Sequence, residues 1–102
     1  MINMFMLVGR TELVTDDYIQ IGFTDKNQKE IHARIYMVGS DTFKSNVREH
    51  LEIGGVVGVK GYLGIIEADK GLKLIGEKFT FLGKSGSISD TKGDEIEDEQ
   101  YL

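Results

Sequence analysis

Three side chains that can recognise nucleic acid alternate with apolar residues in the stretch "IHARIYMVG", residues 31–39. Successive side chains of a β-strand point to opposite faces, so the apolar set goes to a core and His32, Arg34 and Tyr36 share the outer face. Bases stack on phenol, imidazole or guanidinium planes, and a guanidinium also neutralises a phosphate. The alternative is a solvated face with ordinary cross-strand pairs.

Neighbouring segments of the sequence can extend this outer face. Residues 18–24, "YIQIGFT", alternate in the same way, and residues 25–29, "DKNQK", have the composition of a turn. We therefore expect a hairpin that places residues 18–24 beside the stretch above. Taken singly, each lysine nearby is more simply an ordinary surface charge. The residues that would extend the face from this hairpin and from a later one are Tyr18, Lys26, Lys29 and Lys73.

The rest of the pattern predicts three more strands and one helix. Residues 40–51 change to a helical period, with Phe43, Val47 and Leu51 on one stripe and a serine or aspartate at the start that can cap. The strands are residues 4–14 with a break or bulge near Gly9, residues 56–66, and residues 72–82 with a bulge or barrel corner at Gly76.

Five short strands with a helix between the third and the fourth form the layout of an OB-fold. We therefore predict an all-β chain with one short helix, folded as a five-stranded Greek-key barrel. A split α+β sheet is the alternative. Glycines within the strand patterns favour the barrel, because its strands bend at tight corners.

Charge divides the chain into a neutral body and an acidic tail. Residues 1–84 carry eleven Lys or Arg and eleven Asp or Glu, whereas residues 85–102 carry six acids and one lysine. We predict an OB-fold domain over 1–84 and a disordered tail over 85–102, which holds too little apolar surface to fold. Because the body is neutral, the net negative charge of the chain does not exclude an anionic partner such as nucleic acid.

Several classes of protein and site are not expected. The chain has no cysteine, so it forms no disulfide or thiolate metal site, and it has no apolar run long enough to span a membrane. A cytoplasmic protein is the simplest interpretation. Neither of the two histidines, His32 and His50, has a second metal ligand at a suitable spacing. We expect no metal, no cofactor and no catalytic residue, and therefore no enzyme.

The first strand carries apolar residues on both faces. Phe5 and Leu7 have one parity and the face with Met4, Met6 and Val8 has the other. One face enters the barrel, and a second copy of the chain or the domain's own helix covers the other. Because the fourth strand offers only Gly58 for bulky contacts, a dimer is preferred over a tetramer.

Four segments, in order, resemble the bacterial single-stranded DNA-binding proteins. They are "MIN" with "LVGR" in residues 1–10, "HARIYMVG" in 32–39, "HLEIGGVVGVKGYL" in 50–63 and "IGEKFTFLG" in 75–83. An acidic tail follows the last segment. The chain looks like a small, short-loop member of that family that lacks tryptophan.

The resemblance implies an OB-fold homo-oligomer that binds single-stranded DNA without sequence preference in replication, recombination or repair. The family's stacking aromatic on the third strand corresponds to His32, and its basic residue corresponds to Arg34. The family's tail docks replication and repair proteins, here through residues Glu97, Asp98, Glu99, Tyr101 and Leu102. The alternatives are an OB-fold adaptor that binds a protein, or a dimer resembling primosomal accessory proteins, with little affinity for DNA.

Overall fold

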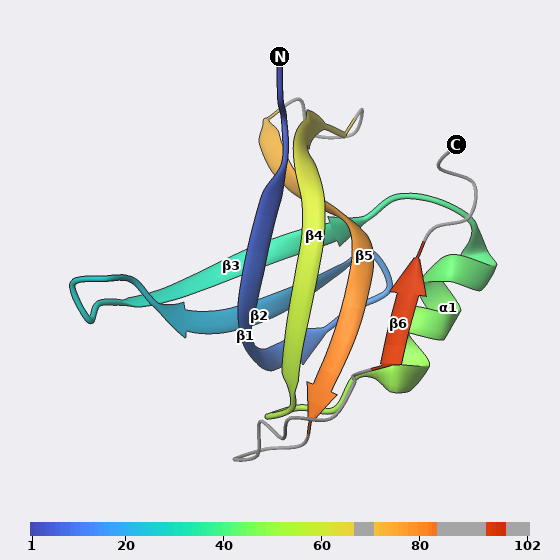
Figure 1. Ribbon diagram of the computed structural model, residues 1–102. Coiled ribbons are helices and arrows are strands. Elements are labelled where there is room, and N and C mark those ends of the chain that lie inside the picture. The colour runs from blue at the N-terminus through green and yellow to red at the C-terminus, as the bar shows by residue number, and fades with distance from the viewer. Residues whose placement is uncertain (67–70, 84–93, 98–102) are drawn as a thin grey trace.

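A computed structural model describes residues 1–66, 71–83 and 94–97, and it contains one helix and six strands (Figure 1). The elements follow the predicted order, with one helix between the third and fourth strands. They are β1 (Phe5–Val14), β2 (Tyr18–Thr24), β3 (Glu30–Met37), α1 (Asp41–His50), β4 (Val56–Ile65), β5 (Leu72–Gly83) and β6 (Asp94–Glu97).

The first five strands close into a barrel. They pair in the order β3-β2-β1-β4-β5, and a parallel pairing of β3 with β5 joins the two ends of the sheet. Figure 1 shows the end of β3 lying beside β5. The prediction of an all-β, five-stranded barrel consistent with an OB-fold is confirmed.

Alternation along the strands fills the barrel with aliphatic side chains. Ile19, Ile21 and Ile35 are fully buried, as their parity predicts, and Phe79 of β5 lies with them. Helix α1 begins after Ser40, whose Oγ accepts a hydrogen bond from the backbone N–H of Phe43 at 3.0 Å. The stripe of α1 that contains Phe43 and Val47 then packs into the same core.

Two bulges bend the long strands. In β5 the register passes from Lys60↔Lys78 to Gly61↔Gly76, so Glu77 is the extra residue and the bulge predicted at Gly76 is confirmed. In β1 the irregularity lies between Thr11 and Leu13, so the break expected near Gly9 is wrong. Position 9 is a glycine for another reason, because a Cβ there would lie 2.6 Å from the carbonyl oxygen of Gly22.

One part of the acidic tail has regular structure. Residues 94–97 form β6, which pairs antiparallel with residues 78–81 of β5 and lies beside α1 (Figure 1). For these four residues the expected disorder is not observed. The other residues of the predicted tail lie outside the described residues.

Candidate nucleic-acid interface

Strands β2 and β3 bring two tyrosines together on the outer face of the barrel. Tyr18 and Tyr36 are direct cross-strand partners, and their ring centroids lie 5.2 Å apart with the ring planes tilted by 47°. Each tyrosine has a buried isoleucine as its neighbour, Ile19 or Ile35, which turns into the core and so directs the tyrosine outward. The pair is an apolar platform fixed by two paired strands.

Two cations flank this pair. The Cζ atom of Arg34 lies 4.9 Å from the ring centroid of Tyr18, and Nζ of Lys73 lies 5.5 Å from that of Tyr36. These distances are those of cation–π contacts. Four of the predicted binding residues therefore form one cluster, called here the tyrosine platform: Tyr18, Arg34, Tyr36 and Lys73.

A hollow of about 410 Å³ adjoins the platform. It receives a further cation from α1, Lys44, whose Nζ lies 3.8 Å from the carboxylate of Asp17. A hollow with apolar walls and ammonium groups at its edge suits a base whose phosphate stays near solvent. The walls are formed chiefly by Tyr36, Val38, Lys44, Ile66 and Lys73.

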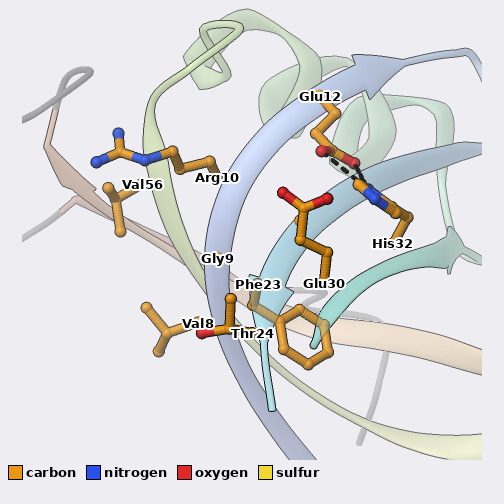
Figure 2. A pocket seen from close by; sticks show the side chains of 10 residues that line it. Val8, Gly9, Arg10, Glu12, Phe23, Thr24, Glu30, His32 and Val56 are labelled. Atoms are coloured by element: carbon orange, nitrogen blue, oxygen red, sulfur yellow. Dashed lines mark hydrogen bonds and ion pairs between the residues drawn. The ribbon is translucent and has the colours of Figure 1, made fainter. Parts of the chain in front are cut away.

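His32 occupies the other end of the same outer face and has an acidic partner. Its Nδ1–H donates to the carboxylate of Glu12, with distances of 2.8 Å and 3.0 Å to the two oxygens. A second hollow, of about 520 Å³, lies at this end of the face, and the residues that line it include Arg10, Glu12, Glu30 and His32 (Figure 2). The imidazole is therefore held by a carboxylate, and Glu30 brings a second carboxylate to this end. Arg10 donates a hydrogen bond to the carbonyl oxygen of Gly54.

The contact between these two groups shifts both of their pKa values. The hydrogen bond with Glu12, and then the charge of that carboxylate, raise the pKa of His32 above its usual value. Hydrogen bonds from His32 and then from Gln20 lower the pKa of Glu12. A Cβ at position 22 would overlap this carboxylate, so the glycine lets the Glu12 side chain lie over β2.

Lys26 and Lys29 lie at the tip of the β2–β3 hairpin. Asp25 holds the turn, since its carboxylate accepts from the backbone N–H of Asn27 at 2.7 Å and of Lys29 at 3.1 Å. The tyrosines pair at the opposite end of the ladder, about 20 Å away over six residue steps. Figure 1 shows the hairpin projecting from the barrel. The structure therefore does not bring these lysines to the platform.

The residues predicted to form a dimer interface are on the surface. Met4, Met6 and Val8 are 54%, 71% and 55% exposed, while Phe5 and Leu7 of the other parity pack against the core. Met4, Met6 and Val8 line an apolar groove together with Leu82 and other residues of β4 and β5. Lys60 and Lys78 also line this groove. Helix α1 packs into the core and does not line this groove.

Of the residues predicted to dock partners through the tail, Glu97 ends β6, opposite Lys78 in the backbone register. Asp98, Glu99, Tyr101 and Leu102 lie outside the described residues. Within the described ranges, no group of three His, Asp or Glu side chains is placed to hold a metal ion. Among the same residues, the only helix is too short and too polar to cross a membrane.

Neither a protein-family model nor a curated protein matches the chain.

Three residues near the face were not identified from the sequence. Glu12 keeps the parity of the exposed residues Met6, Val8 and Arg10, and it is the extra residue of the β1 bulge, so alternation along β1 could have placed it outside. Lys44 comes from the helix, so only the tertiary packing places it. Glu30 was predictable, because it stands two positions before His32 and therefore shares its parity.

Proposed function

We propose that the chain binds single-stranded DNA without sequence preference. The observation that carries the proposal is the tyrosine platform, an aromatic pair with a guanidinium and an ammonium group over its rings. It lies on the β2–β3 face, which OB-folds use to bind oligonucleotides. Aromatic rings stack on every base, and cations track the phosphates, so such a surface requires no particular sequence.

Tyrosine fluorescence tests this proposal directly, because the chain has four tyrosines and no tryptophan. Stacking of bases on Tyr18 and Tyr36 should quench the emission as dT oligomers are added at low salt. A Tyr18→Phe, Tyr36→Phe double variant should keep its affinity in an anisotropy titration but lose most of the quenching. Quenching that is unaffected by the double substitution would place the DNA elsewhere.

The apolar groove supports a second part of the proposal, a homodimer through Met4, Met6 and Val8. Exposed methionine and valine side chains in one groove favour association, because burying them removes apolar surface from water. The same groove is the feature that favours the alternative function, an adaptor that binds a different protein. Sedimentation of the purified chain separates the two, since only a self-complementary face gives a dimer without a partner.

We further propose that the acidic tail competes with DNA for the platform. Six acids against one lysine are tethered to a neutral body, and those outside β6 reach its cations at high effective concentration. Release of the tail by DNA would free its end to dock replication or repair proteins. Truncation after Lys84 should then tighten binding to dT oligomers at low salt, with a gain that shrinks as salt rises. Equal affinities would contradict this role.

A further inference from the structure

Strand register aligns three tyrosines on one line across the barrel. Tyr18 of β2 is opposite Tyr36 of β3, and Tyr36 is in register with Ile75 of β5. Ile75 is in turn opposite Tyr62 of β4. We call these four residues the transverse row. Figure 1 shows the strands that carry it, with β3 ending beside β5 and β4 running next to β5.

The side chains of the row share the outer face. Residues directly opposite in a sheet project to the same side, and the intervening inward positions, Ile35 and Leu74, pack with the core. Gly64 provides a second indication. A Cβ at that position would lie 2.7 Å from Cδ1 of Ile75 and 3.0 Å from Cε2 of Tyr62, so both side chains extend over the same glycine.

A DNA strand whose bases stack on the platform can continue in either of two directions, and the charges along these directions differ. Along β2 and β3 the DNA would meet the carboxylates of Glu12 and Glu30, which repel phosphates. Across the strands the DNA passes Lys73, which lies over the ring of Tyr36, and reaches Tyr62, which is opposite Ile75. The second direction offers a further ring and keeps a cation beside the path.

We propose that single-stranded DNA follows the transverse row, from the platform to a third stacking position on Tyr62. Ile75 is only 4% exposed, so it supports the row from beneath and is not itself a stacking surface. Tyr62 belongs to the DNA path rather than to a subunit contact. Adjacent strands lie about 4.8 Å apart, so the three steps of the row span about 14 Å. At about 3.4 Å per stacked nucleotide, some four to five nucleotides cover it.

This inference rests on the proposed function, and two oligomers of different length test the inference and the proposed function separately. A dT3 probe covers only the platform and is followed by NMR titration, whereas dT8 covers the whole row and is followed by anisotropy, both at low salt. Tyr62→Ala should weaken dT8 by about 5- to 150-fold, the usual range for loss of one stacked base, and leave dT3 unchanged. Tyr62→Phe, which keeps the ring, should bind both probes as the unchanged chain does.

Four results would overturn the inference. If Tyr62→Ala keeps its dT8 affinity while Tyr36→Ala loses it, the path ends at the platform and the proposed function stands. An equal loss for dT3 and dT8 would mean that Tyr62 acts through the fold. A change in sedimentation at unchanged dT8 affinity would make Tyr62 a subunit contact. If the unchanged chain binds neither probe, the proposed function fails and the row fails with it.

A measurement on the unchanged chain covers the case in which Tyr62→Ala does not fold. Oligomers with 5-iododeoxyuridine are irradiated on the protein, and the crosslinked peptides are mapped by mass spectrometry. We expect the dT8 analogue to crosslink at Tyr62 as well as at Tyr18 or Tyr36, and the dT3 analogue only at the platform. Crosslinks from the dT8 analogue that map along β3 to His32, without Tyr62, would contradict the transverse path.

Discussion

Removal of the Arg34 guanidinium should change how DNA binding depends on salt. Arg34 stacks over Tyr18 at 4.9 Å, and Lys73 lies over Tyr36 at 5.5 Å. If each cation neutralises one phosphate, the logarithm of the affinity for a single strand falls against the logarithm of the salt concentration with a slope of about −1.4. Arg34→Ala leaves one such contact and a slope of about −0.7.

The difference is large enough to measure. Between 50 mM and 200 mM salt, a slope of −1.4 lowers the affinity by about 7-fold, and a slope of −0.7 lowers it by about 2.6-fold. The assay is anisotropy of labelled dT8 at four salt concentrations across that range. Arg34→Ala should also lower the affinity at the lowest salt concentration, because it removes a phosphate contact and a stacking plane together.

Two variants make this prediction specific. Arg34→Lys keeps the charge and loses the planar stack on Tyr18, so its slope should equal that of the unchanged chain while its affinity is lower. Lys26→Ala removes a cation at the hairpin tip, far from the platform, and should leave the slope unchanged. If Arg34→Ala and Lys26→Ala change the slope equally, the cations act through general charge and the assignment of a phosphate to Arg34 is refuted.

The other predictions concern the fold and the dimer. The His32–Glu12 pair has a raised histidine pKa and a lowered glutamate pKa. Its stabilisation is therefore complete between the usual glutamate value of about 4.5 and the usual histidine value of about 6.5, and it is lost as the pH rises through the raised histidine pKa or falls through the lowered glutamate pKa. The melting temperature of the unchanged chain relative to His32→Gln should therefore fall as the pH rises through the raised histidine pKa, and a constant difference would contradict it. Gly61→Ala should lower the free energy of unfolding in urea by about 1–3 kcal/mol or more, since its Cβ would overlap the carbonyl of Ile75, whereas Gly58→Ala, with ordinary contacts at 3.7 Å, should not. Met6→Glu should convert a sedimenting dimer to a monomer, and a monomeric unchanged chain would refute the dimer.

Much of the barrel was predictable from the sequence because its strands bury one face. Period-two alternation in β2 and β3 assigned Ile19, Ile21 and Ile35 to the core, and the same parity placed Arg34 and Tyr36 outside. The slip of parity around Gly76 located the β5 bulge. These features follow from local patterns.

Other features depend on contacts between distant segments and left no local pattern. The β1 bulge lies at Glu12, in a strand whose apolar residues do not alternate, so no slip of parity marks it. Strand β6 has an acidic composition typical of disorder, and it becomes a strand only through pairing with β5. The distance of Lys26 and Lys29 from the platform required the length and direction of the hairpin. Because Lys26 and Lys29 are close to β3 in the sequence, they were predicted to extend the same outer face.

Direct titration tests the central claim, that the platform binds single-stranded DNA. Labelled dT8 and a duplex of equal length are titrated with the full chain at low salt, and the single strand is titrated again with Tyr36→Ala. We predict that the single strand binds more tightly than the duplex, whose bases are not available for stacking, and that Tyr36→Ala costs about 1–3 kcal/mol. No binding of the single strand, a preference for the duplex, or an unchanged affinity of Tyr36→Ala would contradict the account.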